Sequence, residues 1–123
     1  MPTPITIKIN DTTLKAELND SPSARAVAER LPMTLSMSRW GEEYYGNCGV
    51  GQAADDSAKE LMDIGELALW PPGSAFCIFF GPTPASSDDR PRAASPANPI
   101  GRLLDDPAPL KGMGGSISAT ISG

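Results

Sequence analysis

The stretch WGEEYYG, from Trp40 to Gly46, combines side chains suited to acid–base chemistry. In a strand, Glu43 and Tyr45 point to one side and Glu42 to the other, so only one carboxyl group can face a given cleft. A carboxyl group that is desolvated beside an indole has a raised pKa and can exchange a proton near neutral pH. Glu42 and Glu43 are therefore the candidate catalytic residues. The alternative is that both carboxylates are solvated or cap backbone amides.

The composition argues against several other kinds of chemistry. The chain has no histidine, which removes Ser-His-Asp and Cys-His catalysis and most zinc sites. Cys48 and Cys77 have no cationic neighbour in the sequence that would activate a thiol, so we expect them to be buried and free. Three aspartate pairs lack the spacing of a calcium loop and fit turns instead, so we expect no metal and no cofactor. These pairs are Asp55-Asp56, Asp88-Asp89 and Asp105-Asp106.

The charge distribution limits the classes of binding partner that we expect. The formal net charge of −5 and the absence of Lys/Arg clusters argue against nucleic-acid binding. The N-terminal sequence MPTPITIKIN lacks the pattern of a signal peptide, and no apolar run is long enough to cross a bilayer. We therefore expect a cytoplasmic protein that binds neither nucleic acid nor membrane. The oligomeric state stays open.

Alternating apolar residues predict a single domain built mainly from short strands. A chain of 123 residues with 13 prolines and 12 glycines favours β structure over a helical bundle. Period-two alternation predicts strands over residues 5–9, 14–18, 33–37 and 117–121. A helix is predicted from Ser21, its N-cap, to Leu31, before Pro32. The residues expected in one core are Ile5, Ile7, Leu14, Leu18, Val27, Leu35, Leu69, Ile78, Ile100, Ile117 and Ile121.

Prolines divide the second half of the chain. The sequence WPPG, residues 70–73, separates two predicted strands. The second of these, Ala75 to Phe80, lacks alternation and is expected to be buried on both faces. Residues 49–63 are expected to be irregular, with a short strand at Val50. Residues 81–99 contain five prolines and are expected to form a long loop, which in a compact domain is usually functional or disordered.

Three motifs carry a resemblance to a known family. They are WGEEYY at residues 40–45, LWPPGSAFCIFFGPTP at 69–84 and ANPIGRL at 97–103. In this order they resemble the small prokaryotic cyclophilin-like proteins, a family usually described as of unknown function. The resemblance covers essentially the whole chain. It implies one mainly β domain over residues 1–123, a closed eight-stranded antiparallel barrel with one or two short capping helices.

The resemblance to the true cyclophilins, which are peptidyl-prolyl isomerases, is fainter. Those enzymes polarise the prolyl amide with an arginine before a bend and a glutamine after it. When WGE is laid on that bend, Met37 stands at the arginine's position and Tyr45 at the glutamine's. Ala75 and Cys77 replace two further residues of the active face. The resemblance therefore implies that the fold is kept while the isomerase residues are not matched.

The same resemblance indicates a binding groove. The proline-rich loop is expected to fold back over the barrel wall, where true cyclophilins bind peptide. Phe80 ends the preceding strand and is expected at the apolar floor of this groove, near Glu43. The alternative is that the loop only fills the groove and that Phe80 is ordinary core. The expected ligand contacts are Trp40, Tyr45, Phe80, Thr83, Ser86 and Asn98. One interpretation of the aromatic run is that Trp70, Phe76, Phe79 and Phe80 line a pocket for a prolyl or aromatic ligand. The alternative, which we favour for Trp70, Phe76 and Phe79, is that they fill the barrel.

Three function classes follow, and fold alone does not choose among them. The first is a domain that binds a peptide or small molecule in the groove beside the barrel wall. The second is an isomerase or lyase that uses Glu42 or Glu43 as acid or base on a small molecule. The third is a weak peptidyl-prolyl isomerase.

Overall fold

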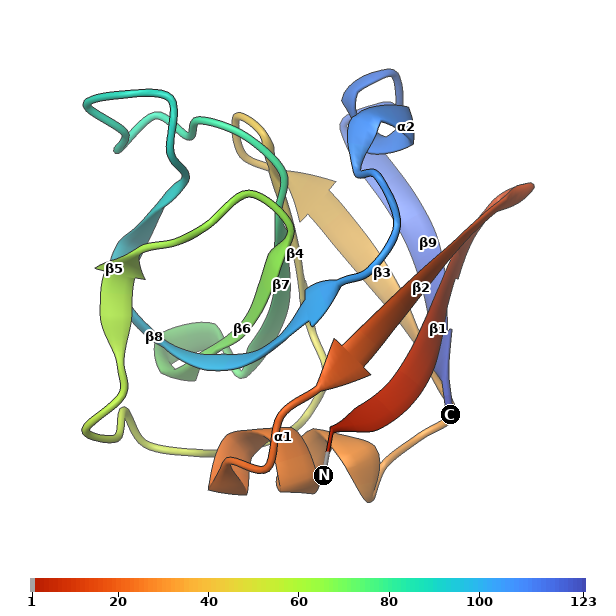
Figure 1. Cartoon of the computed structure of the whole chain (residues 1–123), viewed down its shortest axis with the longest axis vertical. Coiled ribbons are helices and arrows are strands. Elements are labelled where there is room, and N and C mark those ends of the chain that lie inside the picture. The colour runs from red at the N-terminus through yellow and green to blue at the C-terminus, as the bar shows by residue number, and fades with distance from the viewer. Residues whose placement is uncertain (1) are drawn as a thin grey trace.

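The structure, a computed structural model, describes residues 2–123 and is built mostly from β strands (Figure 1). The strands are β1 (Thr3–Ile9), β2 (Thr12–Leu18), β3 (Met33–Arg39), β4 (Glu43–Asn47), β5 (Lys59–Leu61), β6 (Glu66–Trp70), β7 (Ala75–Phe79), β8 (Arg92–Leu103) and β9 (Ser116–Ser122). The helical elements are α1 (Pro22–Ala28), α2 (Ala108–Lys111) and the 3₁₀ turn η1 (Pro71–Gly73). No helix within residues 2–123 has the length and apolar character needed to cross a membrane.

Strand pairing closes the sheet into a ring. The order is β2-β1-β9-β3-β4-β7-β6-β8, and β8 pairs back to β2. The pairings are antiparallel throughout the ring. β5 lies outside the ring, paired with the first half of β8, at the left of Figure 1. The expected eight-stranded antiparallel barrel with two short helices is thus confirmed, and we call this ring the barrel.

The helix α1 begins where the sequence predicts and ends earlier. Ser21 is its N-cap, and the Ser21 hydroxyl accepts a hydrogen bond from the Ala24 amide at 3.2 Å. The helix ends at Ala28 rather than at Leu31. The Leu31 amide bonds to the Ala28 carbonyl at 3.3 Å, a tightening of the last turn that is common before a proline such as Pro32.

Apolar side chains pack on both faces of the barrel wall. The barrel interior, which we call the inner core, contains all the predicted core residues except Ile117, which is half-buried and packs against it. A second group on the outside of the wall, which we call the outer cluster, consists of Met62, Ala68, Ala75, Cys77, Phe79, Ala93 and Ala97, with Trp70 against it. Residues of β7 and the following Phe80 alternate between the two groups, so the segment from Ala75 to Phe80 is buried on both faces, as predicted.

The predictions for two segments expected to be irregular are wrong in part. β8 begins at Arg92, so the predicted loop over residues 81–99 is a strand over its second half. Prolines do not prevent this because Pro99 lies at a register shift, where a missing amide donor is tolerated. In residues 49–63 the strand is β5, and Val50 is buried without belonging to a strand.

The closure between β2 and β8 depends on Gly101. A Cβ at this position would lie 2.0 Å from the Glu17 carbonyl oxygen. We predict that Gly101→Ala lowers the free energy of unfolding by about 1–3 kcal/mol or more, because the strands must separate to admit the methyl group. The matched control is Gly112→Ala, since no atom lies within 4 Å of a Cβ at Gly112. Urea unfolding of both variants measures the difference, and equal stability would show that the closure is not tight.

Candidate functional site

A pocket of about 250 Å³ lies on the outside of the barrel wall. It contains one acidic side chain among aromatic and small apolar ones. Its lining residues are Trp40, Glu43, Tyr45, Trp70, Ala93 and Ala94.

Strand β4 fixes the direction of the two polar lining residues. Glu43 lies opposite Phe79 of β7, and Tyr45 lies opposite Cys77. Residues directly opposite in an antiparallel pair point to the same face, so Glu43 and Tyr45 project outward with the outer cluster. Tyr44 points the other way, into the inner core.

A tight bend places Trp40 beside Glu43. Gly41 has φ +63° at this bend, and the Trp40 amide donates to the Glu43 carbonyl at 2.8 Å. A Cβ on Gly41 would lie 2.8 Å from the Thr83 Cα, so the bend packs directly on the segment after β7. The Glu42 amide bonds to the Pro82 carbonyl at 2.9 Å and reinforces this contact. The WGEEYY and GPTP motifs therefore meet at one edge of the pocket.

Trp70 is held from two sides. Its indole Nε1 donates to the Ser95 Oγ of β8 at 2.8 Å. A Cβ on Gly73 would lie 3.2 Å from two atoms of the indole six-membered ring, so the WPPG turn lies close against that ring. The hydrogen bond and the turn together fix the ring at the pocket wall.

Glu43 is the unusual group of this pocket. Its exposed fraction is 5 %, and it has no ion pair with any of residues 2–123. Burial raises the pKa of Glu43 from 4.5 to about 7, and a hydrogen bond from the Cys77 thiol partly offsets that rise. Burial also raises the pKa of the Cys77 thiol well above its ordinary value, followed by the effect of the adjacent Glu43. Cys48 and Cys77 are both buried and free, as predicted.

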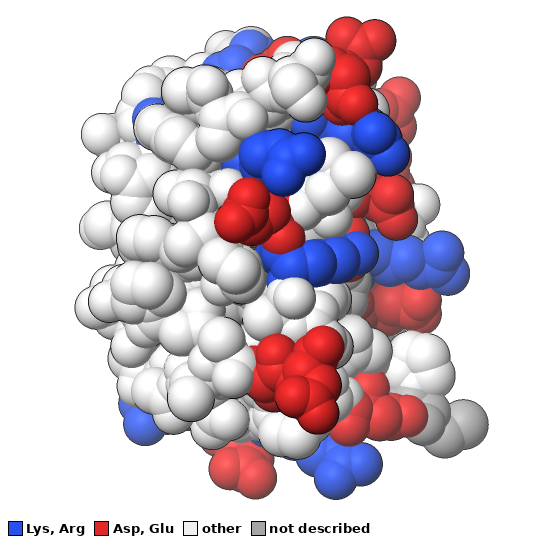
Figure 2. Space-filling view, turned by 90° about the vertical axis from the view of Figure 1, so that its left-hand side faces the viewer, with Lys and Arg blue, Asp and Glu red and all other residues white. Residues whose placement is uncertain are grey.

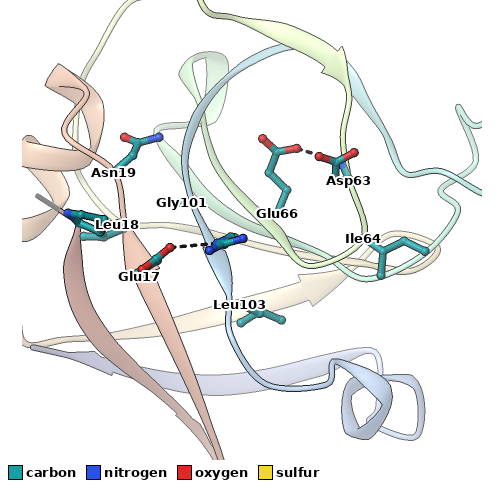
Figure 3. A pocket seen from close by; sticks show the side chains of 10 residues that line it. Glu17, Leu18, Asn19, Asp63, Ile64, Glu66, Gly101 and Leu103 are labelled. Atoms are coloured by element: carbon teal, nitrogen blue, oxygen red, sulfur yellow. Dashed lines mark hydrogen bonds and ion pairs between the residues drawn. The ribbon is translucent and has the colours of Figure 1, made fainter.

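A larger pocket of about 420 Å³ lies elsewhere, between β2, β6 and β8 (Figure 3). Three of its charged side chains, Glu17, Glu66 and Arg102, already have partners. Arg102 Nε donates to Glu17 Oε1 at 2.9 Å, and the Asp63 amide donates to Glu66 Oε1 at 2.9 Å. Glu66 also pairs with Lys59 at 3.0 Å. Because these groups satisfy one another, the larger pocket offers less to a ligand than the pocket of Glu43 does.

The charged surface shows a mixture of signs. Figure 2 views the side of the molecule that carries β5 and β8, and its charged side chains gather on one half, with acidic and basic groups interspersed. β5 contributes Lys59 and Glu60, which pair with Glu66 and Arg92. This side has no broad basic patch of the kind that a nucleic-acid backbone requires.

Comparison with known proteins identifies the family. A family model described as cyclophilin-like matches residues 3–122. The chain belongs to the cyclophilin-like family. The solution structure of a hypothetical protein from Archaeoglobus fulgidus is 34% identical, with a TM-score of 0.81 over 98% of this chain and 94% of that one. No curated protein shows significant similarity to the chain.

Only part of the predicted groove is assembled in this cyclophilin-like domain. Trp40, Glu43 and Tyr45 line one pocket. Glu42 points away, and its carboxylate pairs with Lys111 Nζ at 2.8 Å. Of the two candidate acid–base residues, Glu43 alone lines the pocket.

The expected place of Phe80 at the floor of this groove is wrong. Phe80 is fully buried in the inner core, where its ring stacks on Tyr44 with centroids 5.5 Å apart. Arg39 lies over the same ring, 5.2 Å from its centroid. Phe80 faces inward because it continues the alternation of β7 by one residue, whereas Glu43 faces outward.

The predicted polar contacts hold the chain together instead of lining the pocket. The Thr83 hydroxyl donates to the Arg92 carbonyl, and the Ser86 hydroxyl donates to the Arg90 carbonyl at 2.7 Å, which folds the segment before β8. Asn98 is fully buried. Its amide nitrogen bonds to Ser23 Oγ and to the Ala53 carbonyl, both at 2.9 Å, and its amide oxygen accepts from the Asp55 amide at 3.0 Å.

Trp70, Ala93 and Ala94 are the lining residues that sequence reasoning missed. The expectation that Phe79 and Trp70 fill the barrel is wrong: Phe79 belongs to the outer cluster, and Trp70 points outward and lines the pocket. The available signal was its position at the end of β6, opposite Ala75, because a small partner leaves room for a large ring on the same face. The sequence predicts a loop at Ala93 and Ala94, whereas both belong to β8, which brings them to the barrel wall.

The raised pKa of Glu43 predicts a pH dependence of stability. The folded protein holds the Glu43 proton up to about pH 7, whereas the unfolded chain releases it near 4.5, so stability falls as pH rises through this window. The difference corresponds to roughly 3 kcal/mol at most. We expect wild type to lose stability relative to Glu43→Gln between about pH 5 and about pH 8. Urea unfolding at both pH values measures this, and parallel behaviour of the two proteins would contradict it.

Proposed function

We propose that this cyclophilin-like domain binds a small molecule, or one side chain of a peptide, in the outer-wall pocket between Trp40 and Trp70. The observation that carries the proposal is the buried Glu43 carboxyl group, which has no ion pair and faces an aromatic pocket. Burying an unpaired acid costs stability, and a fold has no packing need for one at this position. A bound ligand supplies the missing partner.

The make-up of the pocket supports binding. Ligand sites are typically apolar with few polar groups, and here the walls are aromatic and alanine side chains while Glu43 provides the polar contact. Glu43 and Tyr45 come from a strand paired along its length with β7, and Trp70 is fixed by Ser95, so the site is preformed. Its volume of about 250 Å³ is slightly below the roughly 300 Å³ at which drug-sized pockets begin. The site therefore fits one ring or head group.

The test is a titration of ¹⁵N-labelled protein with small fragments that each carry one ring or one branched apolar group. We expect the amides of Glu43 and Tyr45 and the indole of Trp70 to shift. Trp70→Ala and Tyr45→Ala should weaken binding by about tenfold or more, as removal of a central aromatic contact does. Tyr45 is partly exposed, so its variant is the safer one for folding.

The matched control is Glu42→Gln, because Glu42 adjoins Glu43 in sequence and pairs with Lys111 outside the pocket. This variant should bind fragments as wild type does. Shifts confined to the larger pocket around Glu17 and Arg102, or binding unchanged by both aromatic variants, would contradict the proposal.

An enzyme is the second candidate function, and the pKa of Glu43 near 7 favours it. A carboxyl group that titrates near neutral pH can take and return a proton, which suits isomerase or lyase chemistry on a bound small molecule. Glu43 is the proposed acid or base, and Glu42 is not. If a bound compound is turned over, Glu43→Gln should abolish turnover even at concentrations of the compound that saturate the pocket, and retained turnover would exclude this role.

Prolyl isomerisation is the activity that the pocket supports least. Among residues 2–123, the pocket lining contains no arginine, and Met37 lies in the inner core. A twisted prolyl amide thus lacks a cationic donor there, and loss of such a donor typically costs about 3 kcal/mol in the transition state. We expect a protease-coupled assay on an Xaa-Pro peptide to give no rate above the uncatalysed one. A rate like that of a true cyclophilin would contradict this expectation.

A further inference from the structure

Three aromatic side chains from different elements line the pocket without stacking on one another. Trp40 comes from the bend after β3, Tyr45 from β4 and Trp70 from the end of β6. The ring contact found within residues 2–123 joins Tyr44 to Phe80, on the opposite side of the wall. The three pocket rings are therefore free to contact a ligand group placed between them.

The pocket contains a negative group and no positive one. Glu43 makes no ion pair with the described residues, although the carboxylates of Glu17, Glu42 and Glu66 do. The cation that lies over aromatic rings, Arg39, contacts Tyr44 and Phe80 in the inner core. Within residues 2–123 the protein thus builds an aromatic, acidic pocket and supplies no cation to it.

We propose that this pocket is an aromatic cage for a methylated ammonium group, an inference that rests on the binding function proposed above. The faces of Trp and Tyr rings attract such a cation by about 0.5–2 kcal/mol each, and a quaternary ammonium loses less hydration on entry than a primary one. The Glu43 carboxylate supplies the opposite charge. The bound cation in turn offsets the free-energy cost of burying the ionised Glu43 carboxylate.

The rival occupant is a neutral ligand that accepts a hydrogen bond from protonated Glu43. The two occupants differ in the direction of their pH dependence. A cation binds the ionised form of Glu43, so its affinity rises through pH 7, whereas a neutral acceptor binds the protonated form and its affinity falls. For a group with a pKa of about 7, the ionised fraction increases about tenfold between pH 6 and pH 8.

Other titratable groups near Glu43 are few. The Cys77 thiol of β7 has a pKa well above the ordinary value, and Tyr45 of β4 is the second titratable residue of the lining. Arg92 precedes the pocket residues of β8 and pairs with Glu60. Because the chain has no histidine, a change of affinity between about pH 6 and about pH 8 is assigned to Glu43, and Glu43→Gln checks the assignment.

The experiment compares choline with its neutral isostere 3,3-dimethylbutan-1-ol. Both are titrated into the full chain at fixed ionic strength, followed by tryptophan fluorescence and by the Trp70 indole resonance. We expect choline to bind at least about tenfold more tightly than the isostere. Its affinity should rise by up to about tenfold from pH 6 to pH 8 in wild type and in the control Glu42→Gln, and stay flat in Glu43→Gln.

A second arm distinguishes the sources of the head group. A short peptide with trimethyllysine is compared with the same peptide carrying unmodified lysine. Tighter binding of the trimethylated peptide than of choline points to a peptide ligand, and the reverse points to a free small molecule. Either result supports the cage.

Two results overturn the cage and leave the pocket as a binding site. One is that the neutral isostere binds as tightly as choline, and the other is that affinity falls as pH rises. If neither cation binds while neutral fragments shift Trp70, the cage is likewise wrong and the proposed function stands. If neither the cations nor the fragments perturb the pocket, both proposals fail.

Discussion

The pairing of β4 with β7 is the constraint on which the site depends. β7 is buried on both faces, so its alternate side chains belong to the inner core and to the outer cluster. Because residues directly opposite in the β4–β7 pair share a face, Tyr44 points inward with Ile78 and Glu43 points outward with Phe79. A register slip of one residue would move Glu43 from the outer cluster into the apolar inner core and turn Tyr44 outward. The inner core therefore fixes the direction of the outer site.

The outer wall becomes a site because the chain returns to cover it. β8 runs along β6, and its first half carries β5, Ala93 and Ser95 over the outside of the wall. The small side chains of Ala93 and Ala94 line the hollow left under this cover, and Trp70 closes one side of it. The same cover desolvates Glu43 and raises its pKa. Pocket shape and electrostatics thus share one structural cause.

The sequence predicted the barrel more fully than it predicted the site. Strict alternation, as in Ile5, Ile7 and Ile9, reports which face of a strand is buried, and these residues are all in the inner core. Alternation cannot reveal a wall that is buried on both sides, so the faces that the sequence predicts for Phe79, Phe80 and Trp70 are wrong. The prolines of residues 81–99 predict a loop where β8 begins. Proline content alone does not show at which positions the hydrogen-bond ladder between strands tolerates the absence of an amide donor.

The site depends on Glu43 being a desolvated carboxyl group on the outer wall of the barrel, without an ion pair among the described residues. A ¹³C NMR titration of its side-chain carboxyl carbon in the ligand-free protein tests this most directly. Burial of Glu43 predicts a midpoint at about pH 7, together with a coupled shift of the Trp70 indole proton. A midpoint near the ordinary value of 4.5 would show that water or a cation already reaches the carboxylate, and that Glu43 is not desolvated.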